Sequence, residues 1–160
     1  MKFKILLTSL LILPIILSST MVQAQSRNFA AHLSQEVASV ESLGQGQFVL
    51  KQSAEGHSFT FRLNLANIEN VTMAHIHIAA VPGGNGPPAV WLYPSAPPAL
   101  LIPGRTQGSL AFGSFDHDQF IGPLAGMHAA DLVMAIHEGR AYVNVHTTAY
   151  PAGEIRGWVK

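Results

Sequence analysis

Nearly perfect alternation of apolar and polar residues is the clearest pattern in this chain, and it covers residues 57–65. One face of the segment carries the apolar side chains of Phe59, Phe61, Leu63 and Leu65, with polar residues between them. A period of two over this length predicts a half-buried β-strand, because successive side chains of a strand point to opposite faces. A helix would scatter the same apolar residues around its axis.

Other short apolar segments predict seven further strands. They cover residues 28–33, 47–51, 71–80, 89–93, 107–112, 141–147 and 154–159, and Gly, Pro and polar residues separate most of them. The last two strands are joined by a turn at residues 150–153, so they should pair as a hairpin. Four prolines between residues 94 and 104 predict an irregular loop there.

One segment departs from the strand pattern. Within residues 128–137, the spacing of Leu132, Ala135 and Ile136 fits one face of a short helix, and Gly139 is well placed to end it. Many short strands with turns between them, plus one helical insert, predict a mainly β protein. The expected architecture is a single Greek-key or immunoglobulin-like β-sandwich.

Residues 1–24 have the layout of a secretory signal peptide. A short cationic start precedes an apolar run over residues 5–17, and Val22 and Ala24 offer small residues at the positions that a signal peptidase reads. A membrane anchor is the alternative, but Pro14 interrupts the run and a span needs about 20 apolar residues. We therefore expect cleavage after Ala24, no membrane span after removal of the signal, and a secreted or periplasmic protein.

The mature chain would span residues 25–160, which is close to the usual size of one domain. Seven of the nine Lys and Arg residues and all nine Asp and Glu residues belong to it, so its formal charge is −2. This charge does not favour nucleic acid as a partner. The chain has no cysteine. Its fold must therefore depend on packing without disulfides, and any metal must be bound by imidazole, thioether or carboxylate groups.

Two histidines separated by one residue are the clearest candidates for a chemical role. Met73, His75 and His77 share one face of the predicted strand 71–80, and the two imidazoles lie about 7 Å apart along it. His146 faces away from the apolar residues of its own strand, so it could join them if the two strands are neighbours. Three imidazoles with an open position suit zinc or copper, and the thioether of Met73 would favour copper.

Simpler roles exist for these residues and for two other polar groups. Each histidine could serve only as a hydrogen-bonding residue of the fold. Residues 116–118 could offer oxygens to calcium, but they lack the spaced carboxylates and the glycine of a calcium loop, so a solvated loop is the simpler interpretation. Glu154 and Arg156 share a strand face and should pair with each other or brace the turn at 150–153. No nucleophile elbow, phosphate loop or dinucleotide motif occurs in the sequence.

Five motifs follow one another along the chain. They are residues 29–37 (FAAHLSQEV), 74–78 (AHIHI), 85–87 (NGP), 142–147 (YVNVHT) and 150–157 (YPAGEIRG). Together they resemble the CHRD domain, a family named after its occurrence in chordin, and the similarity spans about residues 28–159. The first motif is shorter than is usual in the family, because Ser34 is followed directly by residues 35–37.

The resemblance implies a β-sandwich module that acts outside the cytoplasm. In animals the family's repeats belong to a secreted antagonist that sequesters growth factors, and single-domain bacterial members are exported proteins. The expected function is therefore that of a binding module rather than an enzyme, with an extracellular or periplasmic ligand that the sequence does not identify. The alternative is a metalloenzyme similar to copper/zinc superoxide dismutases, which also carry a His-x-His pair in a Greek-key sandwich, although this chain lacks their cysteines.

Overall fold

The alternating segment becomes a central strand of the first of two sheets. The computed structural model describes residues 27–35 and 40–160, in which the first sheet has the strand order β1-β2-β3-β6 and is antiparallel throughout. Its strands are β1 (Asn28–Leu33), β2 (Gln45–Gln52), β3 (Ser58–Glu69) and β6 (Arg105–Asp116). The apolar face of β3 points inward, and Phe59 and Leu63 on it are fully buried. The period-two prediction for this segment is confirmed.

The second sheet is also antiparallel and has the order β5-β4-β7-β8. Its strands are β4 (Val71–Ile78), β5 (Pro88–Tyr93), β7 (Ala141–Thr147) and β8 (Ile155–Trp158). The predicted hairpin of the last two strands is confirmed, since β7 pairs with β8. The pairing of β4 with β7 joins segments about 70 residues apart in the sequence.

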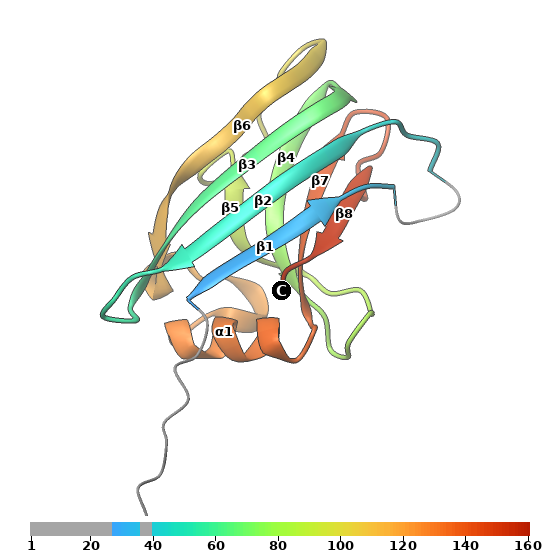
Figure 1. Cartoon of the computed structure of the whole chain (residues 1–160). Coiled ribbons are helices and arrows are strands. Elements are labelled where there is room, and N and C mark those ends of the chain that lie inside the picture. The colour runs from blue at the N-terminus through green and yellow to red at the C-terminus, as the bar shows by residue number, and fades with distance from the viewer. Residues whose placement is uncertain (1–26, 36–39) are drawn as a thin grey trace, which may run out of the picture.

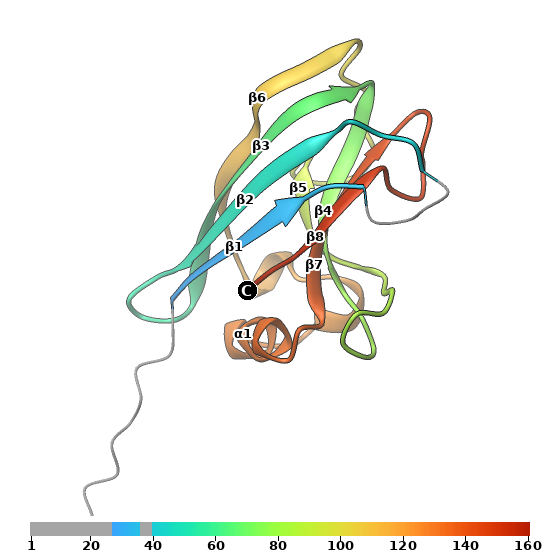
Figure 2. The ribbon, with the colours of Figure 1, turned by 45° about the vertical axis from the view of Figure 1, so that its right-hand side comes forward.

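The two sheets lie face to face with one hydrophobic core between them (Figure 1). Ile76 and Val143 of the second sheet and Phe48 of the first are fully buried in this core. The only α-helix in the described part of the chain, α1 (Ala129–His137), lies at one end of the sandwich, as Figure 2 shows from a second angle. The short 3-10 turns η1 (His117–Gln119) and η2 (Gly122–Leu124) precede it.

These observations confirm the predicted fold class, a mainly β sandwich with one short helical insert. The helical face predicted from Leu132, Ala135 and Ile136 is buried, and Gly139 follows the helix with a left-handed φ of 67°. Strand lengths were predicted less well. β6 extends well beyond the expected residues 107–112, because β3 pairs with it over its whole length through two register shifts. β4 ends at Ile78, two residues earlier than expected.

The predicted signal peptide and its cleavage after Ala24 lie outside the described residues. Within residues 27–35 and 40–160, no helix has the length and apolar character needed to cross a membrane.

Candidate functional site

The register of β4 against β7 places the predicted ligands on the outer face of the second sheet, away from the core. Three pairs of residues lie directly opposite one another: Met73 with His146, His75 with Asn144, and His77 with Tyr142. Opposite residues of an antiparallel pair share a face, with Cβ atoms about 5 Å apart. All four candidate ligands named from the sequence therefore lie on one face, and the three histidines among them form a cluster.

The three imidazoles contact one another. The Nδ1 atom of His75 lies 3.3 Å from the Nε2 atom of His146, and the three ring centroids are 5.2 to 5.7 Å apart. One nitrogen from each of His75, His77 and His146 lies within 4.8 Å of the others. Nitrogens that bind one zinc ion at about 2.1 Å in tetrahedral geometry lie about 3.4 Å apart. A movement of each nitrogen by less than about an ångström would therefore bring all three within bonding distance of one ion.

Backbone carbonyl groups orient two of these rings. The Nδ1 atom of His77 donates to the carbonyl oxygen of Gly86, and that of His146 donates to the carbonyl oxygen of Pro151, both at 2.9 Å. A carbonyl group can only accept, so in the neutral imidazoles the proton is on Nδ1 and the lone pair is on Nε2. The Nε2 atom of His146 then accepts from Nδ1 of His75, which leaves the lone pair of His75 on its own Nε2 atom.

Two of these lone pairs are buried without a partner. The Nε2 atoms of His75 and His77 have no hydrogen-bond partner among the described residues, although the side chains are only 3% and 7% exposed. A buried polar atom without a partner costs about 1–3 kcal/mol. The cluster therefore presents three nitrogen lone pairs, two of which no group of the described residues satisfies.

The surroundings keep the histidines neutral. Burial, together with the neighbouring His146 and His77, lowers the pKa of His75 to about 3. Burial also lowers the pKa of His77 to about 4; His146 and the Arg156 guanidinium act in the same direction, and the hydrogen bond to Gly86 opposes them. For His146, burial lowers the pKa and the bond to Pro151 partly opposes this. At neutral pH all three imidazoles are in the form that binds metal ions.

The Asn85-Gly86-Pro87 motif holds its loop against the cluster at His77. Both backbone polar groups of Gly86 bond to the Tyr142 hydroxyl, which accepts from its N–H at 3.1 Å and donates to its carbonyl oxygen at 3.0 Å. A Cβ atom on Gly86 would lie 1.9 Å from the carbonyl oxygen of Ile78. Only glycine fits this close approach, so the motif is explained by the geometry that brings its carbonyl group to His77.

The turn between β7 and β8 holds the cluster at His146. Asn144 donates to the carbonyl oxygen of Ala152 at 3.2 Å, next to the carbonyl group of Pro151 that holds His146. Gly153 has a φ of 125°, and a Cβ atom there would lie 2.3 Å from the Asn144 amide. The motif at residues 150–157 thus holds His146 in place.

Glu154 braces this turn, as its position in the sequence predicted. Its two carboxylate oxygens accept hydrogen bonds from the hydroxyl groups of Ser42 at 2.6 Å and Thr147 at 2.7 Å. The Thr147 hydroxyl oxygen in turn accepts from the backbone N–H of Tyr150 at 3.1 Å. The carboxylate therefore fixes the turn and ties it to the segment before β2.

Arg156 has a position that the sequence did not predict. Its guanidinium lies 5.3 Å from the ring centroid of Tyr142 and 5.7 Å from that of Trp158, and it donates to the side-chain oxygen of Asn85. It also lines a pocket of about 350 Å³ whose wall includes His77. The register of the hairpin is the feature that could have indicated this position of Arg156, because Arg156 lies opposite Asn144, which in turn lies opposite His75.

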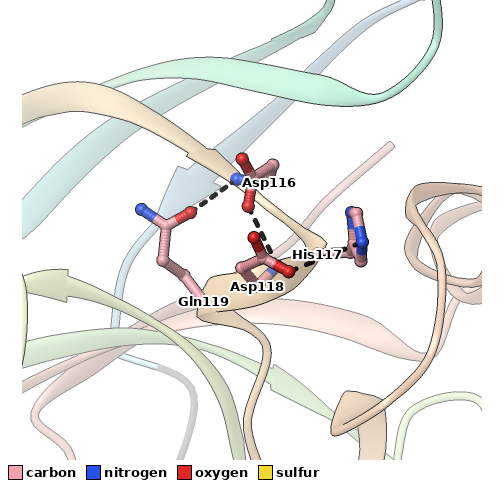
Figure 3. A network of polar contacts seen from close by, with 4 residues as sticks. All are labelled: Asp116, His117, Asp118 and Gln119. Carbon is pink, nitrogen blue, oxygen red and sulfur yellow. Dashed lines mark hydrogen bonds and ion pairs between the residues drawn. The ribbon is translucent and has the colours of Figure 1, made fainter.

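The second acidic candidate, residues 116–118, has a structural role (Figure 3). The Asp116 carboxylate accepts from the backbone N–H of Asp118 at 2.9 Å, and the Gln119 side chain accepts from the N–H of Asp116 at 2.8 Å. This reciprocal arrangement is a capping box that begins η1. The Nε2 atom of His117 lies 3.5 Å from a carboxylate oxygen of Asp118, and both side chains are exposed. The segment is largely solvent-exposed, as the simpler interpretation expected, but it forms the end of β6 and the turn η1 rather than a loop.

Comparison with known proteins identifies the family but no individual relative. The CHRD domain matches residues 29–159, which is nearly the whole described chain. No curated protein and no solved structure matches it. The match includes the His-x-His strand, the Asn-Gly-Pro loop and the closing hairpin that together build the cluster. This chain belongs to the CHRD domain family.

Proposed function

We propose that this CHRD domain is an extracytoplasmic binding module that holds one copper or zinc ion through His75, His77 and His146. The observation that carries the proposal is the pair of buried Nε2 atoms, on His75 and His77, that have no partner among the described residues. A histidine that serves only the fold is expected to have its buried nitrogens paired. A metal ion bound by these lone pairs would remove the cost of leaving them unpaired.

The donor set and its supports fit a metal centre. Histidines that bind metals commonly donate their other ring N–H to a backbone carbonyl or a carboxylate, which fixes the tautomer and the ring orientation. His77 and His146 make such bonds to Gly86 and Pro151. Three imidazoles leave an open position, which suits zinc or copper. Met73 is half-buried opposite His146, and its thioether would favour copper as a fourth ligand.

Metal analysis tests the proposal directly. The purified mature domain is loaded with Cu(II) or Zn(II), dialysed and analysed for bound metal, together with the variants His77→Ala and His146→Ala. We expect one ion per parent chain and loss of stoichiometric binding in both variants. His32→Ala is the matched control, because His32 is exposed on the outer face of the other sheet. Substoichiometric metal in the parent, or equal binding in the two cluster variants, would contradict the proposal.

The competing function is a metalloenzyme similar to superoxide dismutases. It requires the same cluster and differs only in turnover, so the metal-loaded protein must be assayed for superoxide consumption. We expect none above that of free metal. Turnover that disappears in His75→Ala would replace the binding module with an enzyme.

The proposed location outside the cytoplasm rests on the family and on the signal-like residues 1–24. Mass spectrometry of the exported protein should find Gln25 as the first residue. An intact chain that remains in the membrane fraction would contradict it.

A further inference from the structure

We propose that two copies of this chain form a dimer through the free edge of β6, which joins their first sheets into one continuous antiparallel sheet. The dimer would use the first sheet and does not depend on the proposed metal site, which lies on the second. Three features of β6 support it: an edge that no other element covers, a symmetric order of inward and outward side chains, and opposite charges at its two ends.

β6 differs from the other edge strands of the two sheets, which are β1, β5 and β8. The C-terminal segment that continues β8 covers the edge of β1, since Ala30 exchanges two backbone hydrogen bonds with Lys160, both at 2.9 Å. β5 has only six residues, and its Ala89 carbonyl oxygen accepts from the N–H of Ile121 at 2.9 Å. β6 has 12 residues and forms the margin of the first sheet (Figure 1), and among the described residues its backbone has no backbone partner outside β3.

The middle of this edge lacks the residues that usually prevent pairing with another chain. Free edges commonly carry charged side chains or proline for that purpose. Residues 106–115 of β6 contain neither. In their midst, Phe112 is 74% exposed. The edge is therefore suited to accept a further strand.

The pairing of β6 with β3 shows which way the side chains of β6 point, because residues opposite one another share a face. One extra residue in β6 shifts this register, so two successive side chains face inward. Leu110 packs against the core, and Ala111 lies opposite the buried Leu63. On both sides of this bulge the faces alternate. The residues that face outward are Arg105, Gln107, Ser109, Phe112, Ser114 and Asp116.

The order of outward and inward residues is the same when β6 is read from either end. Two antiparallel copies therefore match over all 12 residues when a two-fold axis passes between Leu110 and Ala111. A shift of the second copy by one residue would set outward side chains opposite inward ones. A shift by two residues would do the same at the bulge. The bulge thus selects one register for a second copy of this strand.

The side chains that meet in this register are complementary. Arg105 lies opposite Asp116 of the second copy, and the two-fold axis produces this pair of opposite charges twice. Asp116 uses one carboxylate oxygen to cap η1, which leaves the other for the pair. On its other side Arg105 lies opposite Glu69 of its own chain, so its guanidinium would stand between two carboxylates. Phe112 lies opposite Ser109 of the second copy, whose small side chain leaves room for the exposed ring.

Sedimentation of the mature protein over a range of concentrations tests the proposal. We expect a monomer–dimer equilibrium that neither chelator nor zinc changes, because the histidine cluster lies on the other sheet. Phe112→Lys places a charge in the middle of the paired edge and should weaken the dimer by a factor of about ten or more. Val49→Lys is the matched control, since Val49 is 49% exposed on the outer face of β2, away from the edge, and should leave the dimer unchanged.

The charged pairs add a second test. Arg105→Gln removes both pairs and should weaken the dimer by a factor of about 2 to 30. Added salt should weaken the parent dimer more than the dimer of this variant.

Disulfide crosslinking tests the register, because the chain has no cysteine of its own. Gln107 should lie opposite Ser114 of the second copy. An oxidised mixture of Gln107→Cys and Ser114→Cys should therefore give a crosslinked dimer. Either variant alone should not, since its two thiols would lie about 20 Å apart along the strands.

Three results would overturn the dimer. A parent protein that stays monomeric up to millimolar concentration would do so and would leave the edge to a strand of another protein. A dimer that Phe112→Lys does not weaken would have its interface elsewhere. A dimer whose cysteine mixture fails to crosslink would have another register. Metal content decides the proposed metal site separately, so none of these results bears on it.

Discussion

Replacing His77 by phenylalanine separates a metal ligand from a histidine that serves only the fold. The imidazole of His77 stacks on Tyr142, with ring centroids 5.0 Å apart and an angle of 19° between the rings. A phenyl ring can keep this stack. It cannot keep the hydrogen bond to Gly86, and it brings no Nε2 atom into the buried cluster.

The balance of these changes can be worked from the structure. Loss of the bond from His77 to Gly86 costs about 1 kcal/mol. The carbonyl oxygen of Gly86 still accepts from the Tyr142 hydroxyl, so it is not left unpaired. The Nε2 atom of His77 is buried without a hydrogen-bond partner among the described residues, so its removal should stabilise the folded state by about 1–3 kcal/mol. We therefore expect the metal-free variant to be as stable as the parent or up to about 2 kcal/mol more stable.

The assay is urea unfolding with a chelator present and again with zinc present. Zinc at a hundred times its dissociation constant should stabilise the parent by about 2.7 kcal/mol, because it binds only the folded state. His77→Phe should lose most of this gain while keeping its stability in chelator. This combination, a variant that is stable but does not respond to metal, is expected of a functional ligand.

The opposite result would refute the reasoning. If His77→Phe is destabilised by more than about 1 kcal/mol in chelator, the imidazole of His77 has a structural role and its unpaired Nε2 atom does not destabilise the folded protein. His32→Phe provides the control, since His32 is exposed and should change neither stability nor the response to zinc.

Two further predictions concern the loop and the pH. Gly86→Ala should lower the metal affinity by a factor of 10–100 and destabilise the fold, because the added Cβ atom would collide with the backbone at Ile78. Gly84→Ala is the control in the same metal titration. Gly84 lies in the same loop, and an added Cβ atom there would have its closest contacts at 3.2 Å, so the effect should be much smaller. The stability of the metal-free protein should fall as the pH is lowered from 6.5 towards 4, since the unfolded chain then takes up protons that His75 and His77, with pKa values of about 3 and 4, exclude in the folded state. Urea midpoints measured across this range in chelator should fall less steeply for His77→Phe, and identical slopes would contradict the assignment.

The local pattern of the sequence was sufficient for the strands, the helix and the faces of individual residues. Alternation identified β3 and the inward face that Phe59 and Leu63 occupy. The same rule placed His75 and His77 on the face opposite Ile76, and His146 on the face opposite Val143. These inferences succeed because a side chain's direction in a strand depends only on its own backbone and its near neighbours.

The ends of the strands and their pairing could not be predicted from the local pattern of the sequence. β6 extends beyond the segment that its composition suggested, because β3 pairs with it through two register shifts that single-sequence patterns do not reveal. The neighbouring position of β4 and β7 was a condition of the metal hypothesis, and only the pairing of the strands met it.

The state of the histidines was decided entirely by tertiary contacts. Nothing local to His77 or His146 indicates that the carbonyl groups of Gly86 and Pro151 fix their tautomers, or that Arg156 lies beside the same pocket. Burial and hydrogen bonding depend on which loops fold back over the sheet, and those loops come from segments that are distant in sequence or lie beyond a turn. Alternation along the strands was enough to predict that these histidines face away from the core, whereas the packing of loops on the sheet made them a cluster of neutral, partly unpaired imidazoles.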